Sequence, residues 1–299
     1  MPHLKMSSFL HEEGLGKTLK SVIPTSLKGE MKGWLTSFNR ATLALRRMPD
    51  FIIVGAQKSG TSSLFKYCRQ HHQINTCWLK EVHFFDKNFH QGEDWYRSNF
   101  PISFNSPEAS VVGEATPYYL VHPHAPKRIY DLLPSVKLIV LLRDPVERAI
   151  SHYYYEIKNG REHLPIDKAL MTEEERLKDE WERMVNDGSY ISQAHQNFSY
   201  KQRGVYIDQL EKYFTYFSKD QVLILDCQEL FSTPQKALCD VFEFLGVDID
   251  TSVVNDWKPK NVNHLTKDVP SDIYSYLENY FAPHNERLFQ SLGRTFDWR

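Results

Sequence analysis

The chain has 299 residues, of which 41% are hydrophobic and 25% are charged, and its formal net charge is −2. This length is sufficient for one large or two small globular domains with a substantial core. The near balance of charges excludes bulk nucleic-acid binding, which requires a strongly basic domain, but it leaves room for a local basic cleft.

Apolar runs and cysteine spacing bear on the cellular compartment. No run approaches 18 apolar residues, so we expect no transmembrane segment, and residues 1–47 lack the apolar segment of a signal peptide. None of the four cysteines forms a pair with metal-binding spacing, and so few thiols suit a reducing compartment. We therefore expect a cytoplasmic protein whose cysteines are small buried hydrophobes: Cys68, Cys77, Cys227 and Cys239.

The chain divides into a polar N-terminal part and a longer domain. Residues 1–48 are weakly periodic and are predicted to be a partly helical extension, with an amphipathic helix over 31–47. That helix packs on the domain or, as the alternative, lies on a membrane surface. Residues 49–299 contain no repeat and no low-complexity linker, so they are predicted to form a single domain.

The first strong signal lies at residues 51–64. Four apolar residues, 51–54, lead into a turn bounded by Gly55 and Gly60, and small hydroxyl residues follow. This pattern predicts a buried strand, a tight turn and the first turn of a helix. The N–H groups of such a turn and of the helix start would bind a phosphate.

This turn differs from a nucleotide-hydrolysing P-loop in the position of its lysine. Gly55 and Gly60 have the P-loop spacing, but Thr61 stands where the lysine belongs, and Lys58 lies inside the turn. A nucleotidase needs adjacent Lys and hydroxyl groups for the γ-phosphate and Mg²⁺. Lys58 is instead placed to stabilise a leaving phosphate without a metal. The alternative is an ordinary glycine turn before a helix.

The rest of the chain alternates buried strands with helices, which indicates an α/β fold whose parallel sheet is covered on both faces. Strands are expected at 111–118, 136–142 and 222–226, and residues 81–86 are read as a short strand or the start of a loop. Helices are expected at 126–133, 146–158, 165–187, 206–217 and 234–245.

A second anion site is predicted at the end of the strand 136–142. Ligands of such sheets bind beyond the carboxyl ends of the strands, where Arg143 lies. Ser151 follows about two helical turns later. The guanidinium fork and the hydroxyl could together grip a phosphate. The alternative for Arg143 is a surface ion pair with Asp144 or Glu147.

Several motifs together resemble those of a known family. Residues 55–62, 80–86 and 142–151, with 113–118, 203–206 and 293–298, are similar to the sulfotransferases that use 3′-phosphoadenosine 5′-phosphosulfate (PAPS). The similarity is closest to the heparan sulfate N- and 3-O-sulfotransferase branch and its bacterial relatives. It implies a P-loop-like three-layer fold, with a central, mainly parallel sheet flanked by helices. It also implies PAPS as donor, 3′-phosphoadenosine 5′-phosphate (PAP) as product, and no required metal.

The resemblance also assigns roles to individual residues. The loop that binds the 5′-phosphosulfate would comprise Lys58, Ser59, Gly60, Thr61 and Ser62. Arg143 and Ser151 would grip the 3′-phosphate, and Arg203 would be a further donor contact. Glu81 matches the general base and His83 is its neighbour in the cleft.

These roles predict transfer of a sulfuryl group to a hydroxyl or amine by in-line displacement. Lys58 would neutralise charge on the bridging oxygen, and Glu81 would take the acceptor's proton. Burial would raise the pKa of Glu81, while Lys80 and His83 would lower it. The alternative for Glu81 is a simple salt bridge with Lys80. For His83, a catalytic role and a purely structural one are both open. The aromatic groups 84–85 and 153–155 are interpreted as packing.

Departures from the heparan branch bear on the acceptor. The 3-O enzymes have basic residues at the positions of Ser62 and Ala115, a C-terminal cysteine pair, and a Lys-Gly-Arg loop where this chain has 258–263. The expected acceptor is therefore another glycan, a glycolipid or a small alcohol, and a soluble bacterial-type enzyme is favoured.

Two other classes remain as alternatives. A nucleotide or nucleoside kinase would share the strand, turn and helix of residues 51–64, with Asp144 as the candidate Mg²⁺ ligand. A nucleotide-binding module without chemistry would not need both Lys58 and Glu81.

Overall fold

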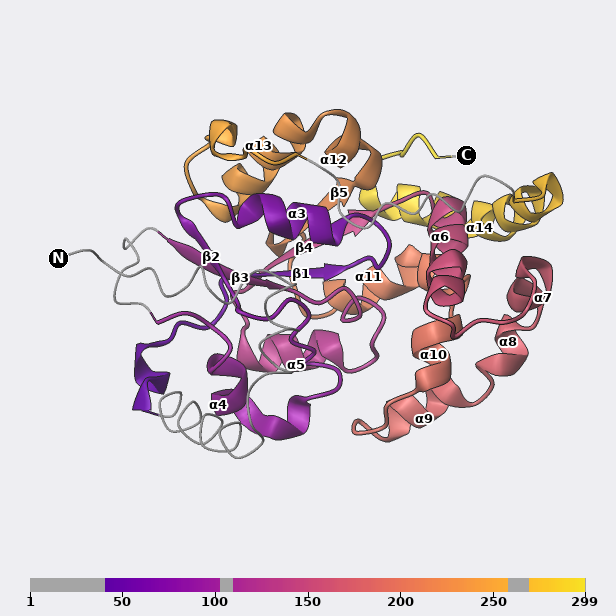
Figure 1. Ribbon diagram of the computed structural model, residues 1–299, viewed down its shortest axis with the longest axis horizontal. Coiled ribbons are helices and arrows are strands. Elements are labelled where there is room, and N and C mark those ends of the chain that lie inside the picture. Colours follow the sequence, from indigo (N-terminus) through magenta and orange to yellow (C-terminus); the bar gives the residue numbers. More distant parts are fainter. Residues whose placement is uncertain (1–40, 103–109, 258–268, 299) are drawn as a thin grey trace, which may run out of the picture.

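A five-stranded parallel sheet forms the centre of the molecule (Figure 1). The computed structural model describes residues 41–102, 110–257 and 269–298. The strands are arranged in the order β2-β3-β1-β4-β5, and every neighbouring pair is parallel. The predicted α/β class is thus confirmed. The strands are β1 (Phe51–Gly55), β2 (Ile74–Thr76), β3 (Val111–Ala115), β4 (Lys137–Leu142) and β5 (Val222–Asp226).

The middle strand β1 is buried along its whole length, which explains its unbroken apolar sequence. Phe51 aligns with Gly113 of β3 on one side and with Lys137 of β4 on the other. A Cβ atom on Gly113 would lie 2.1 Å from the Phe51 ring, so only glycine fits beside this aromatic side chain. The large ring at the start of β1 thereby fixes the identity of its neighbour in β3.

Helices cover both faces of the sheet (Figure 1). The helices α3, α12 and α13 lie on one face, and α5 and α11 lie on the other. The bounds are α3 (Thr61–Cys68), α4 (Gly92–Arg97), α5 (Ala125–Leu132), α6 (Pro145–Lys158), α7 (Ile166–Met171), α8 (Glu173–Arg176), α9 (Glu180–Asn186), α10 (Gln193–Phe198), α11 (Tyr206–Phe214), α12 (Cys227–Ser232), α13 (Pro234–Leu245) and α14 (Ser271–Leu292). Short 3-10 helices are η1 (Leu43–Leu45), η2 (Phe89–Gln91), η4 (Gln202–Gly204), η5 (Lys219–Gln221) and η6 (Thr251–Val253).

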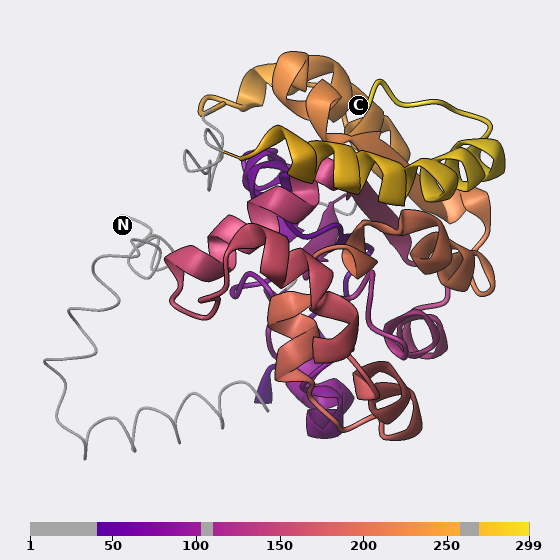
Figure 2. The ribbon, with the colours of Figure 1, turned by 90° about the vertical axis from the view of Figure 1, so that its right-hand side faces the viewer.

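The helix α6 starts directly after β4, beyond the carboxyl ends of the strands. Asp144 caps it, because its side chain accepts hydrogen bonds from the N–H groups of Val146 and Glu147. Pro145 occupies the first turn, where its missing N–H has no cost. Figure 2 looks onto this side of the molecule and shows α14 crossing the helices that follow β4. The start of α6 thus lies at the edge of the sheet where ligands bind in α/β proteins.

Several details differ from the sequence-based expectations. The expected helix 165–187 is divided into α7, α8 and α9, whereas residues 81–86 form a loop with a turn, one of the two alternatives expected for them. The edge strand β2 and the long helix α14 were not predicted. Of the helix expected over 31–47, residues 31–40 lie outside the described residues, and the remainder contains only η1. The loop 258–263 also lies outside the described residues.

The cysteine expectation is mostly correct. All four thiols are free; Cys68, Cys77 and Cys227 are buried, whereas Cys239 is half-buried. Burial raises the pKa of the Cys68 thiol to about 12, so it behaves as a small hydrophobe. No helix within the described ranges has the length and apolar character needed to cross a membrane.

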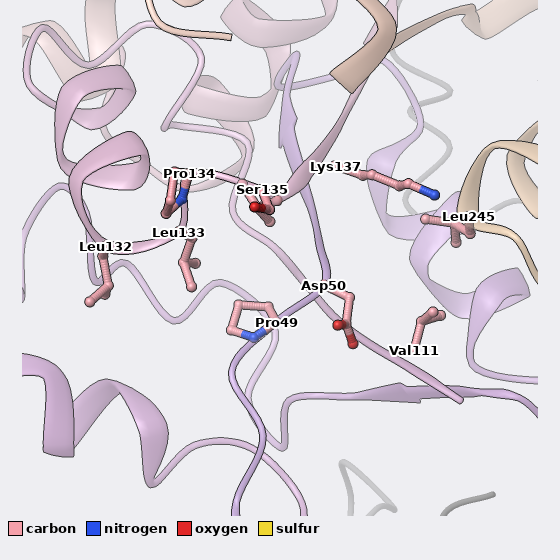
Figure 3. A pocket seen from close by; sticks show the side chains of 10 residues that line it. Pro49, Asp50, Val111, Leu132, Leu133, Pro134, Ser135, Lys137 and Leu245 are labelled. Carbon is pink, nitrogen blue, oxygen red and sulfur yellow. The ribbon is translucent and has the colours of Figure 1, made fainter. Parts of the chain in front are cut away.

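A cavity of about 470 Å³ lies at the amino ends of the strands, opposite the edge where α6 begins (Figure 3). Asp50 and Lys137 line it, but both are engaged elsewhere. Asp50 pairs with Arg47 at 2.9 Å, and the Lys137 ammonium donates to the carbonyl of Phe244 at 2.7 Å. The cavity therefore offers no unpaired charge for a ligand among these two residues.

Candidate active site

Three neighbouring strands deliver the predicted site residues to one edge of the sheet. The turn with Lys58 follows β1, Arg143 follows β4, and the backbone N–H of Glu81 donates to the carbonyl of Ala115 at the end of β3, at 3.0 Å. Because β3, β1 and β4 are adjacent and parallel, their carboxyl ends lie side by side. The three segments therefore meet at the same edge of the sheet, the carboxyl ends of β3, β1 and β4, which we call the mouth.

The turn after β1 has the geometry of an anion-binding loop. Gly60 has a φ of 93°, a left-handed conformation that favours glycine, and no side chain caps the helix α3 that begins after it. The first N–H groups of this helix lack intrahelical acceptors and carry the positive end of its dipole. Ser59 and Thr61 are buried, and Ser62 is half-buried. The turn can thus cradle a phosphate with backbone donors.

Lys58 supplies the charge in this turn. Its backbone also has a positive φ, 72°, and its ammonium lies 4.5 Å from the centroid of the Tyr155 ring of α6. Burial, assisted by the charge of Arg143, lowers the pKa of Lys58 to about 8. The lysine is therefore charged at neutral pH, but its ammonium is poorly solvated. An anion placed beside it would be bound strongly.

Arg143 lies next to the same turn. Its Nη1 donates to the carbonyl oxygen of Lys58 at 3.3 Å, and its Nη2 pairs with Glu147 at 3.2 Å. The Tyr206 hydroxyl donates to the Arg143 carbonyl at 2.8 Å, which fixes the backbone. The ion pair between Arg143 and Glu147, the alternative to a phosphate-binding role, is therefore present together with a contact of Arg143 to the turn. Ser151 lies further along α6 and is 4% exposed.

Arg203 is buried and contacts the turn through a side chain of the turn itself. It is 4% exposed, and its guanidinium donates to the Gln57 side chain and to the carbonyls of His195 and Gln196. The link between Arg203 and the phosphate turn thus runs through Gln57. These contacts let the arginine support the turn, and its role as a further donor contact stays a prediction.

Glu81, His83 and Asp86 form a chain of charged side chains. The Nε2 of His83 is 3.5 Å from Oε2 of Glu81, and its Nδ1 is 2.7 Å from Oδ2 of Asp86. The Asp86 side chain is fully buried, whereas that of Glu81 is 40% exposed. Glu81 and His83 have φ values of 61° and 53°, so the backbone of this turn is strained. Glu81 is the exposed end of this chain.

The protonation states follow from these contacts. Burial would raise the pKa of Glu81, but the hydrogen bond from His83 and the charge of Lys80 together lower it to about 2. Burial would lower the pKa of His83, but its bonds to Asp86 and Glu81 raise it to about 9. At neutral pH, the side chain of His83 is therefore an imidazolium ion between two carboxylates. In this state its Nε2–H faces the carboxylate of Glu81.

Lys80 joins this chain to the phosphate turn. Its ammonium donates to the Ser62 hydroxyl at 2.5 Å and to Oε1 of Glu81 at 3.0 Å. The salt bridge considered for Glu81 is thus present, and it is part of a longer connection. Glu81 accepts from two cations in the resting protein, and the side chain remains partly exposed to an incoming group.

Sequence reasoning assigned no role to three residues that matter here. Asp86 holds His83, Gln57 joins the turn to Arg203, and Tyr155 lies under the Lys58 ammonium. Among these, the spacing of His83 and Asp86 is compatible with one turn and could have suggested their pairing. Within the described residues, no group of three or more His, Cys, Asp or Glu side chains could hold a metal ion.

The chain is similar to known proteins over most of its length. The model of the sulfotransferase domain family matches residues 48–299. The membrane-associated sulfotransferase kil1 of Dictyostelium discoideum is 28% identical, over 84% of this chain and 67% of its own length. Heparan sulfate glucosamine 3-O-sulfotransferase 3A1 of Mus musculus is also 28% identical, over 85% of this chain and 65% of its own. This chain thus spans about two thirds of the length of these two relatives.

A solved structure extends the similarity to three dimensions. The crystal structure of a sulfotransferase from Alicyclobacillus acidocaldarius is 30% identical to this chain and superposes with a TM-score of 0.68. The match covers 84% of this chain and 98% of that one.

Proposed function

The chain belongs to the sulfotransferase domain family, and from this premise we propose that it transfers a sulfuryl group from PAPS to a hydroxyl or amine of an acceptor. One observation carries the proposal. Three adjacent strands bring three groups to one edge of the sheet. They are the lysine inside the anion-binding turn, Lys58, the arginine beside it, Arg143, and the partly exposed carboxylate of Glu81.

The donor fits the positive side of the mouth. PAPS carries a phosphosulfate at its 5′ end and a phosphate at its 3′ end, and it supplies the sulfuryl group. The uncapped start of α3 and the Lys58 ammonium would hold the 5′ end, while Arg143, with Ser151, would hold the 3′-phosphate. As the bond to sulfur breaks, Lys58 would neutralise the charge that develops on the leaving oxygen. This role needs no metal ion.

Glu81 is the group that would accept the acceptor's proton. Its low pKa keeps it ionised throughout the physiological range, so it can accept a hydrogen bond from a hydroxyl or amine. The proton of that group becomes acidic only as its bond to sulfur forms, so proton transfer is favourable in the transition state and not before it. His83 and Asp86 would keep the carboxylate oriented.

The surroundings of Glu81 favour an acceptor other than a polyanionic chain. Ala115 is fully buried and cannot contact an acceptor, and the Ser62 hydroxyl already binds Lys80. Trp78 and Leu79 are 49% and 58% exposed and directly precede Lys80 and Glu81 in the chain. These two side chains offer exposed apolar surface close in sequence to the base. A glycan, a glycolipid or a small alcohol suits this environment.

The metal ligand proposed for the kinase alternative takes part in the start of α6. The Asp144 carboxylate accepts the N–H groups of Val146 at 2.8 Å and Glu147 at 3.4 Å. Oδ1 of this carboxylate is therefore engaged at the start of α6, which gives Asp144 a structural role there. The observation supports transfer without a divalent metal.

The proposal is tested by transfer from PAPS labelled in its sulfuryl group to a panel of glycans, alcohols and amines in the presence of EDTA. We expect labelled product with the wild-type protein. Glu81→Gln should lower turnover roughly 10²- to 10⁴-fold, the usual contribution of a general base. Its affinity for PAP should be nearly unchanged, because Glu81 meets only the acceptor. Near-normal turnover in this variant would show that Glu81 is not the base.

A further inference from the structure

Tyr155 lies in the last turns of α6, and the face of its ring contacts the side chain of Lys58. The Lys58 ammonium is 4.5 Å from the centroid of the Tyr155 ring, within the distance at which a cation is attracted by an aromatic face. Tyr155 is half-buried. The neighbouring ring of Tyr154 packs against Tyr153 instead, with centroids 5.1 Å apart.

We propose that Tyr155 is a positioning residue for sulfuryl transfer, whose ring keeps the Lys58 ammonium charged and aimed at the leaving oxygen. The inference rests on the function proposed above. It assigns to this aromatic side chain a task beyond the packing expected from the sequence.

The ring of Tyr155 is itself fixed in place. The guanidinium carbon of Arg161 lies 5.5 Å from its centroid, and the Nε of Arg161 donates to the carboxylate of Glu156. The side chain of Glu156 is 1% exposed, and its other oxygen lies 3.4 Å from Nε2 of His152, which is also buried. This buried anchor holds Arg161, and Arg161 restrains the ring. Lys58 therefore rests on a support that cannot easily turn away.

The charges around Lys58 explain why such a support is useful. Burial is the largest influence on its pKa, and the surrounding cations lower it further, whereas one carboxylate raises it. The cations are Arg143 at the end of β4 and Arg148 and Lys158 on α6, and the carboxylate is that of Glu156, also on α6. With burial and three cations opposing the ammonium, the negative face of the ring favours the charged form.

Three variants separate the ring from the bulk of the side chain. Tyr155→Leu keeps an apolar residue of moderate size but removes the aromatic face, and Tyr155→Phe keeps the face and removes the hydroxyl. Tyr154→Leu is the matched control, because it removes a half-buried ring from the adjacent position of the same helix. Tyr155→Met replaces the leucine variant if the latter does not fold.

Two measurements follow. The first is the pKa of Lys58 by NMR of protein carrying isotope-labelled lysine side chains, with the signal assigned by its loss in Lys58→Arg. The second is the slow release of PAP from PAPS in buffer, with water as acceptor. Tyr155→Leu should lower the Lys58 pKa and slow PAP release roughly three- to thirtyfold at neutral pH, the range that cation–π energies imply. Tyr155→Phe and Tyr154→Leu should resemble the wild type.

The outcomes are distinct. An unchanged Lys58 pKa and unchanged PAP release in Tyr155→Leu would overturn the inference, and so would equal losses in Tyr155→Leu and Tyr154→Leu. If the wild-type protein neither binds PAP nor releases it from PAPS, the proposed function fails, and the positioning role in transfer fails with it. The NMR comparison would then still decide whether the ring stabilises the Lys58 charge.

Discussion

Arg143 is the residue whose contacts best separate donor binding from chemistry. It bonds to the backbone of the Lys58 turn and to Glu147, and neither contact involves the position of a sulfuryl group. If its guanidinium grips the 3′-phosphate, it contributes to binding equally in the ground and transition states. Its loss should therefore appear in affinity rather than in turnover.

We expect Arg143→Ala to weaken PAP binding roughly 10- to 150-fold, since a hydrogen bond to a charged group contributes about 1.5–3 kcal/mol. Turnover at saturating PAPS should change little. The measurement is titration calorimetry with PAP alongside kcat. Glu147→Gln is the control: it removes the ion-pair partner but leaves the guanidinium, so PAP affinity should be kept or improved. Unchanged affinity in Arg143→Ala would mean that the 3′-phosphate binds elsewhere.

For individual residues, the sequence predicted which side chains belong to the site better than it predicted their charges and contacts. Lys58 and Arg143 could be singled out because each follows a recognisable strand, whereas Glu81 was assigned through the resemblance to the family. The charge on His83 could not be predicted, because it depends on a turn with two positive φ values that brings Asp86 to one ring nitrogen and Glu81 to the other. The same holds for Arg203, whose burial behind Gln57 is a tertiary property.

Among the elements, α6 connects both parts of the site. It begins at Asp144, directly after Arg143, and its later turns carry Tyr155 and Glu156. Its position therefore affects the guanidinium at one end and the support of Lys58 at the other.

Removing the cap of α6 tests this dependence and the kinase alternative together. Asp144→Ala should lower the free energy of unfolding by about 0.5–2 kcal/mol, the typical cost of losing an N-cap. Asp144→Asn keeps a capping oxygen, so its stability and its sulfuryl transfer should stay close to those of the wild type. Urea denaturation and the transfer assay provide the comparison. Normal stability in the alanine variant would contradict the cap, and loss of transfer in the asparagine variant would indicate a further role for the carboxylate.

The elements that sequence patterns revealed are those with strong, uniform periodicity. The continuous apolar runs of β1 and β4 are typical of strands buried on both faces, and both were located closely. The edge strand β2 has only three residues, two of them polar, so it gave no signal. The helix α14 contains Pro283, which normally argues against a helix interior. Asp179, with a φ of 63°, precedes α9 and interrupts the expected helix 165–187.

Over the whole molecule, the charged chain in the site makes stability depend on pH. The folded pKa of His83, about 9, lies above its usual value of 6.5. The imidazolium therefore contributes stability that is complete below about pH 6.5 and is lost as the pH rises through about 9. Glu81 has a folded pKa of about 2, so its contribution is present above about pH 4.5 and is lost as the pH falls through about 2.

The loss of stability at alkaline pH can be measured against a variant that lacks the titrating imidazole of His83. Between about pH 6.5 and 9, the free energy of unfolding of the wild type should fall relative to His83→Gln by up to about 1.4 kcal/mol per pH unit. Urea denaturation of both proteins across this range gives the difference. Parallel curves for the two proteins would show that His83 is not held as an imidazolium.

The central claim is that the mouth at the carboxyl ends of β3, β1 and β4 binds a 3′-phosphorylated adenosine nucleotide without a divalent metal. The most direct measurement is the melting temperature with PAP in EDTA, compared with ATP in Mg²⁺. PAP at about 100 times its Kd should stabilise the folded protein by about 2.7 kcal/mol, and MgATP should have little effect. A shift with MgATP and none with PAP would contradict the account.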